Sequence, residues 1–243
     1  MTHSNTVGSA IYQKIKDDII YGKLQPSTKL KLDKLSNSYS VSMSTLRECL
    51  NRLSSEGFVS AEEQRGFFVT SISLNDFEEI TNLRILLECH ALKLSLKNGD
   101  TEWEGNLVGA YHKLHTKEKE MQNGDVSTKK SLIRYDWGFH QSLILACNSA
   151  NLISLHSLLY YKFLRYQMLL TSSRGSEAVN EHKKIFDSAL ERDFPKAEKE
   201  LKNHVKMGLN FISKGYKFNW SLIVLFYTIY KIEFRLNREN TFW

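Results

Sequence analysis

Four side chains of the kinds that bind divalent metal ions occur on three predicted helices. Asp136 and His140 are four residues apart, so they project from the same face of one helix. His182 and His204 lie on two further helices, 22 residues apart. Three imidazoles and one carboxylate suit Zn²⁺, Ni²⁺ or a similar divalent ion, and helical bundles build metal sites from facing helices. The alternative is that these side chains only pack and hydrogen-bond in a helical core.

Two arginines are candidates for holding a negatively charged effector. Arg165 stands among apolar neighbours such as Phe163 and Leu164, where an unpaired guanidinium is costly and a carboxylate could satisfy it by two hydrogen bonds. Arg84 could act in the same way, although Glu88 four residues later offers an ordinary salt bridge within the helix. The expected effector is therefore a small carboxylate or dicarboxylate.

A third set of residues has the chemistry needed to contact DNA. Ser42, Ser44 and Thr45 begin a predicted helix, where hydroxyls and free backbone N–H groups can donate to phosphates. Arg47 follows within the first turn and can reach a phosphate or a guanine edge in the major groove. The alternative for Ser42 is that it only caps the helix.

The tip of a predicted hairpin adds a further candidate contact. Arg65 is followed by Gly66, and a glycine lets the backbone approach a ligand closely. This pair could enter the minor groove beside the helix. The alternative is that Arg65 is a solvated turn residue.

Composition indicates that the elements carrying these residues are mostly helical. The chain has 243 residues, 42% of them hydrophobic and 25% charged, which excludes a disordered tail, a collagen-like fibre or a cysteine-dense scaffold. It has only two prolines, and long helices tolerate few prolines. We expect a mainly α protein.

The first 72 residues have the layout of a winged helix-turn-helix. Three short helices are expected, followed by a β-hairpin at residues 58–61 and 66–70 with a glycine-containing turn. Gly57 is expected to end the third helix. The apolar stripes of the three helices are Ile11, Ile15, Ile19 and Ile20; Leu30, Leu32, Leu35 and Tyr39; and Leu46, Leu50 and Leu53.

Residues 73–216 are predicted to form an all-α bundle of six or seven helices. Ser73 or Asn75 can cap the first helix, which sets the domain boundary near residue 72. Residues 217–243 form a C-terminal extension of unknown role. The expected helices are 76–97, 101–123, 129–147, 152–172, 176–191 and 194–214.

Charge and cysteine usage limit the class of protein further. The net charge is +6, but residues 1–72 hold nine Lys/Arg against seven Asp/Glu, so charge alone does not locate a DNA-binding segment. Three scattered cysteines favour reduced thiols in a cytoplasmic protein. The N-terminus has no apolar signal segment, and the longest apolar run, Trp220–Tyr230, is too short to span a membrane.

The third predicted helix also resembles a known family. The run Val41-Ser-Met-Ser-Thr-Leu-Arg-Glu-Cys-Leu-Asn-Arg-Leu53, followed by Glu56-Gly-Phe-Val59, resembles the recognition helix of GntR-type bacterial repressors. Residues 19–26 resemble the family's I-x-x-G-x-L-x-P pattern. The resemblance implies a DNA-binding repressor. Met43 and the pair Leu32-Asp33 depart from the pattern, because many members carry arginine there, and this leaves the operator sequence open.

The bundle resembles the C-terminal (FCD) domain of the FadR-type branch of that family. The matching residues are Arg84 and Glu88, Asp136 and His140, Glu181-His182, Ala197 and His204. Residues 99–104 and 164–166 are most similar to the carbon-starvation-induced regulator within that branch. The resemblance implies a central cavity, with Asp136, His140, His182 and His204 at the family's four metal-ligand positions. The other histidines, His3, His90, His112, His115 and His156, match no ligand position.

These features predict a cytoplasmic transcriptional regulator that binds double-stranded operator DNA as a homodimer. A small carboxylate in the metal-containing bundle would control its operator affinity, and the ion would be zinc, nickel or another divalent metal. One alternative is a metal-dependent hydrolase with a fused winged helix, although H-E-x-x-H, G-x-S-x-G and glycine-rich phosphate loops are all absent from the sequence. The other is a winged-helix DNA-binding protein that responds to no ligand.

Overall fold

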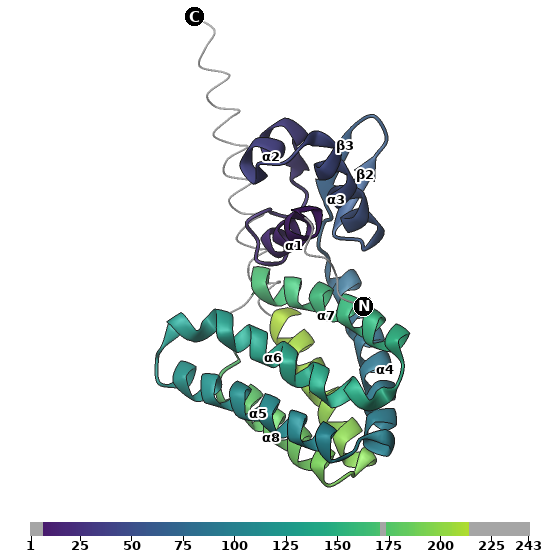
Figure 1. The fold of residues 1–243 in the computed structure, drawn as a ribbon. Helices are drawn as coiled ribbons and strands as arrows, with labels where there is room; N and C mark the ends of the chain where they lie inside the picture. The colour runs from purple at the N-terminus through teal and green to yellow at the C-terminus, as the bar shows by residue number, and fades with distance from the viewer. Residues whose placement is uncertain (1–6, 171–173, 214–243) are drawn as a thin grey trace, which may run out of the picture.

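A computed structural model describes residues 7–170 and 174–213. Within these ranges the protein is mainly helical and contains one small sheet (Figure 1). The C-terminal extension, residues 217–243, and His3 lie outside the described residues. No described helix combines the length and the apolar character needed to cross a membrane.

The N-terminal half is a winged helix-turn-helix, as the sequence predicts. Its helices are α1 (Val7–Ile20), α2 (Leu32–Tyr39) and α3 (Met43–Ser55). Its strands are β1 (Lys29–Leu30), β2 (Val59–Glu62) and β3 (Gly66–Val69), which form an antiparallel sheet in the order β1-β3-β2. The hairpin of β2 and β3 is the wing beside α3 (Figure 1).

Leu30 lies in a strand, although its spacing places it in the second predicted helix. Ser27 has a φ of 62° and turns the chain, and its N–H then donates to Val69. Leu30 consequently pairs with Phe67 of β3, and α2 begins only at Leu32. An apolar residue such as Leu30 would be buried either in a helix or in a strand, so the apolar pattern could not distinguish the two.

Local capping sets the start and the orientation of α3. Ser40 adopts a left-handed conformation after α2, and the Ser42 hydroxyl then accepts a hydrogen bond from the Thr45 N–H at 3.2 Å. Leu46 and Leu50 are fully buried on the inner face. Arg47, the next residue after Leu46, is therefore held on the outer face.

The C-terminal half is an all-α bundle. Helix α5 packs against α6 and α8, and α4 packs against α7. The last turn of α6 continues as a short 3₁₀ segment, Leu145–Cys147. The helices are α4 (Leu74–Asn98), α5 (Thr101–Gln122), α6 (Lys129–Ile144), α7 (Ala150–Leu170), α8 (Ser176–Leu190) and a final one over residues 194–213.

Helix α7 belongs to the cores of both halves. It crosses the bundle directly beneath the N-terminal half in Figure 1 and packs against α1. Tyr160 and Leu164 are buried in the core of the winged helix, whereas Phe163 and Tyr166 are buried in the core of the bundle. A movement of α7 would therefore be transmitted to both halves.

Candidate metal centre and ligand cavity

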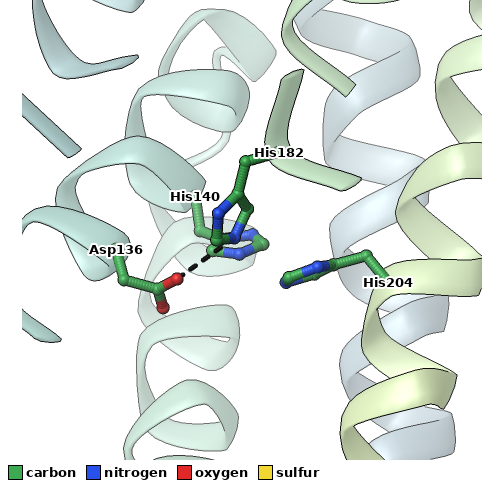
Figure 2. Close-up of side chains that lie close together, drawn as sticks. All are labelled: Asp136, His140, His182 and His204. Atoms are coloured by element: carbon green, nitrogen blue, oxygen red, sulfur yellow. Dashed lines mark ion pairs between the residues drawn. The ribbon is translucent and has the colours of Figure 1, made fainter. Parts of the chain in front are cut away.

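The four predicted ligands meet inside the bundle. Asp136 and His140 extend from α6, His182 from α8, and His204 from the helix of residues 194–213, and all four point toward one another (Figure 2). One potential ligand atom from each lies within 4.8 Å of the others. The three histidines are buried, and Asp136 is partly exposed.

Each of these histidines is oriented by a carboxylate on a different helix. In every case the carboxylate faces the ring's Nδ1, which favours a proton on Nδ1 and leaves Nε2 as the possible metal ligand. The three Nδ1 contacts are His140 to Glu88 at 2.5 Å, His182 to Glu118 at 2.6 Å, and His204 to Glu181 at 2.8 Å.

The inward-facing atoms fit a metal ion. His140 Nε2 is buried and has no hydrogen-bond partner in the described part of the chain. His182 Nε2 lies 3.2 Å from Asp136 Oδ1, the contact dashed in Figure 2. A buried ring nitrogen without a partner is costly, and a divalent cation would satisfy it. The donor set and the orphaned nitrogen therefore both agree with the metal interpretation.

Burial and neighbouring charges set different protonation states for the three rings. Burial lowers the pKa of His140 and keeps the ring neutral. Burial, together with the nearby rings of His182 and His140, holds the pKa of His204 well below its usual range. Burial also opposes a charge on His182, but hydrogen bonds to Asp136 and Glu118 outweigh it and raise its pKa to about 9. Of the three rings only His182 is therefore positively charged, and it faces the carboxylates of Asp136 and Glu118.

Arg84 makes the predicted salt bridge and still has an unused donor. Its Nε lies 2.9 Å from Glu88 Oε2, and both side chains are buried. Its guanidinium is centred 4.6 Å from each of the rings of Tyr160 and Phe163. One terminal nitrogen is buried and finds no hydrogen-bond partner among the described residues, and Arg84 lines the cavity described next.

A cavity of about 510 Å³ opens beside the four ligands. His182, His204 and Asp136 form part of its wall, together with Arg84. Most of the remaining wall is apolar and comes from α5, α6, α7, α8 and the helix of residues 194–213. The cavity thus joins a polar end, which carries the candidate metal ligands, to an apolar compartment.

Arg165 is placed elsewhere than its sequence context indicates. It lies outside the cavity wall, and its guanidinium donates to the backbone carbonyl of Thr70 in the segment between β3 and α4. The neighbouring Tyr166 donates to Asp76 at 2.6 Å and accepts from the Ser73 N–H at 3.2 Å. Arg165 therefore fastens α7 to the connection between the two halves.

Sequence reasoning did not identify the carboxylates that orient the ring nitrogens. Glu118 is on α5, and only the tertiary fold brings it to His182 on α8. Glu88 stood out as a family match and as a partner for Arg84, and it also contacts His140 and His156, the latter at 3.1 Å. No spacing rule connects residues on different helices, so these partners carry no local signal.

The predicted DNA-contacting residues of α3 lie on an open surface. The Ser42 hydroxyl is 2.8 Å from the Ser44 hydroxyl and 2.9 Å from the Thr45 hydroxyl, so the three form one polar group at the helix start. The Arg47 side chain is exposed and pairs with no group in the described ranges. It is available to an external partner.

The wing residues are exposed as well, but Arg65 is already paired. Its guanidinium contacts Glu62 across the hairpin, and 70% of its side chain remains exposed. Gly66 has a φ of +90°, and a Cβ there would meet no atom within 4 Å. The surface around Gly66 is therefore open, whereas Arg65 would have to exchange Glu62 for a phosphate or a base.

Comparison with known proteins identifies two sequence families in the chain. Residues 8–69 match the family described as bacterial regulatory proteins, gntR family, and residues 79–207 match the FCD domain. The chain is 35% identical over 206 residues to the HTH-type transcriptional regulator BphR of Paraburkholderia xenovorans, covering 84% of each protein. It is 26% identical over 213 residues to the HTH-type transcriptional repressor GlaR of Escherichia coli, covering 84% of this chain and 94% of that one.

Solved structures show the same fold. E. coli McbR/YncC is similar with a TM-score of 0.74 at 18% identity, covering 88% of this chain and all of that one. A GntR transcriptional regulator from a Rhodococcus species gives a TM-score of 0.69 at 19% identity, covering 85% of this chain and 97% of that one. At these identities the likeness concerns the fold alone.

Proposed function

The chain belongs to the GntR family of bacterial regulatory proteins and carries an FCD domain; from this premise we propose that it is a repressor whose operator affinity is set by a carboxylate bound at a metal ion. The family consists of DNA-binding transcriptional regulators, which are not enzymes, so the hydrolase alternative is excluded. The presence of a GntR domain and an FCD domain in one chain agrees with the FadR-type branch of the family. The closer likeness to the carbon-starvation-induced regulator stays a prediction.

The observation that carries the proposal is that buried polar atoms without a partner lie at the candidate metal centre and in the wall of the cavity beside it. His140 Nε2 and a terminal nitrogen of Arg84 are both buried without a hydrogen-bond partner in the described residues. In our proposal Asp136, His140, His182 and His204 hold a zinc, nickel or other divalent ion, which supplies positive charge for a carboxylate oxygen. Arg84 binds the same carboxylate. If the protein bound no ligand, the absence of hydrogen-bond partners for these buried atoms would have no explanation.

We propose that the protein acts in the cytoplasm. To repress a gene there, it must bind the operator through the exposed groups of α3 and the wing. We propose that Ser42, Ser44 and Thr45 contact phosphates and that Arg47 reads a base edge or a phosphate. Gly66 lets the wing approach the minor groove, and Arg65 contributes there after releasing Glu62. The relative GlaR is itself named a repressor, which supports the sign of the regulation.

Tyr160 connects the ligand site to the DNA-binding winged helix, called the reading head below. Its hydroxyl donates to Asp136, and its ring is buried in the core of the winged helix. An effector that moves Asp136 therefore moves a side chain packed against the N-terminal half. Such a link can couple the two sites, because each site then favours one position of the same element.

Tyr160→Phe is expected to uncouple the two sites. The variant keeps the ring in the winged-helix core but loses the hydrogen bond to Asp136. Effector affinity should change little, whereas the effector-induced change in operator affinity should shrink by about 2- to 30-fold. Fluorescence anisotropy of a labelled operator with and without effector measures this. A full response in the folded variant would contradict the proposed route.

Glu118→Gln is expected to weaken metal binding by about 10- to 100-fold, because Glu118 orients His182 through its Nδ1. Glu120→Gln is a matched control, since Glu120 lies on the same helix and its carboxylate pairs with Lys117, outside the candidate metal centre. Competition with a chelator of known affinity measures the difference. Equal metal affinity in the two variants would show that Glu118 does not orient a ligand.

The protein is expected to be a dimer, because two reading heads related by a two-fold axis match the half-sites of a palindromic operator. Sedimentation equilibrium should give twice the chain mass of 28.2 kDa at micromolar concentration. A 28.2 kDa species that binds a palindromic site without cooperativity would rule this out.

The proposed function is tested by releasing the protein from its operator. The complex is formed on a labelled operator fragment and titrated with carboxylates, once with metal-loaded protein and once after chelation. We expect an effective carboxylate to lower operator affinity only in the metal-loaded protein. A carboxylate response that survives chelation would contradict the metal-dependent site.

A further inference from the structure

The cavity extends from the metal centre in one direction along the bundle. On α6 its wall residues precede Asp136, and on α8 they precede His182, whereas on the antiparallel final helix they follow His204. At a rise of 1.5 Å per residue, seven or eight residues beyond the ligands correspond to about 10–12 Å. These wall residues are Lys129, Leu132 and Ile133 on α6, Gly175 immediately before α8, Ala178 and Val179 on α8, and Gly208, Phe211 and Ile212 on the final helix.

The compartment beyond the metal centre is walled mainly by apolar side chains, with the amides of Gln122 and Gln167 among them. Leu164 and Met168 of α7 and Met121 of α5 join the aliphatic residues of α6 and α8 there, and Phe211 adds an aromatic ring. The whole cavity, about 510 Å³, lies in the range that encloses drug-sized ligands. A carboxylate with only a few carbon atoms would leave most of this apolar wall uncovered.

Among the described residues, the charged side chains of this compartment that could hold a second carboxylate are already engaged or lie at the surface. Arg174 is bound to Glu181 at 2.7 Å and also contacts His204. Lys129 is exposed to solvent. A second carboxylate placed between these positions would lose its hydration against apolar walls, which is costly.

We propose that the effector is a monocarboxylate with an extended apolar body, such as a medium-length acyl chain. The carboxylate binds at the metal centre and Arg84, and the body fills the compartment lined by Leu132, Val179 and Phe211. This inference rests on the proposed function, because it assumes that the cavity is the effector site. It narrows the effector class from any small carboxylate or dicarboxylate to amphipathic monocarboxylates.

Calorimetry with a chain-length series on the metal-loaded, full-length protein tests the proposal. The probes are acetate, butyrate, hexanoate and octanoate, with glutarate compared against pentanoate. Each added methylene that is buried should tighten binding by about fourfold, and glutarate should bind more weakly than pentanoate. An affinity that does not depend on chain length, or tighter binding of glutarate, would overturn the proposal.

A cavity-filling variant separates this inference from the proposed function. Ala178→Leu narrows the apolar compartment, so octanoate binding should weaken by more than tenfold while acetate binding stays the same. Asn180→Leu is the matched control, since Asn180 is exposed on the same helix and does not line the cavity. If all the acids bind in a metal-dependent way and Ala178→Leu has no effect, only the proposal of an amphipathic monocarboxylate is overturned. If no carboxylate binds the metal-loaded protein, both the inference and the proposed function fail.

Discussion

His204→Ala is expected to remove most of the bound metal and to weaken carboxylate binding in the same variant. His204 is buried and supplies one of the four converging ligand atoms. With only Asp136, His140 and His182 left, the ion loses a ligand, and the metal affinity should fall by at least 100-fold. Removing a residue that only hydrogen-bonds to a metal ligand already costs about 10- to 100-fold. Effector affinity should fall with it, because the ion is part of the effector's site. Elemental analysis and calorimetry on the same sample measure both quantities.

His90→Ala is the control for this prediction, because His90 is an exposed histidine on α4 and is no part of the metal centre. If the four residues only pack and hydrogen-bond, His204→Ala should lower the free energy of unfolding and leave the metal content unchanged. Operator binding without effector should persist in both variants, since the reading head lies in the N-terminal half. A His204→Ala protein with wild-type metal content would therefore contradict the assignment.

Arg47→Ala is expected to weaken operator binding by about 1–3 kcal/mol, or roughly 5- to 150-fold. The side chain is exposed on α3 next to the buried Leu46, and it has no partner within the described residues. Its removal should therefore leave the free energy of unfolding nearly unchanged. Anisotropy titrations of one operator fragment at fixed salt measure the loss of affinity, and thermal unfolding checks the fold.

Arg134→Ala controls for net charge, because it removes the same charge from an exposed position on α6 in the bundle. Its operator affinity should stay close to that of the wild type. If the two variants bound equally well, Arg47 would contribute only to the overall charge and would make no direct contact. Wild-type affinity in folded Arg47→Ala would refute the assigned contact.

The helices and the meeting of Asp136, His140, His182 and His204 could be predicted from sequence because their signals are local or recur in a known family. The stripe of Leu46, Leu50 and Leu53 and the Ser42 cap determine α3, and the structure confirms both. The two-residue strand β1 could not be predicted, because Leu30 continues a helical spacing while its partner Phe67 is 37 residues away. Short strands depend on their partners more than on their own residues.

The polar partners within the core were harder to predict than the core itself. An arginine in an apolar sequence indicates only that the guanidinium needs a partner. For Arg165 that partner is the Thr70 carbonyl, and for Arg84 it is Glu88. Each guanidinium keeps one buried nitrogen without a hydrogen-bond partner among the described residues. Which arginine faces the cavity depends on the packing of α4 and α7, and a single sequence carries no signal for it.

The most direct test of the account is the metal content of the wild-type protein together with its response to chelation. The protein is purified without added metal, analysed for bound elements, and titrated with octanoate before and after treatment with a chelator. We predict about one divalent ion per chain and octanoate binding that is lost on chelation and restored by adding the ion back. A protein that carries no metal and binds carboxylates equally well with and without chelator would contradict the account.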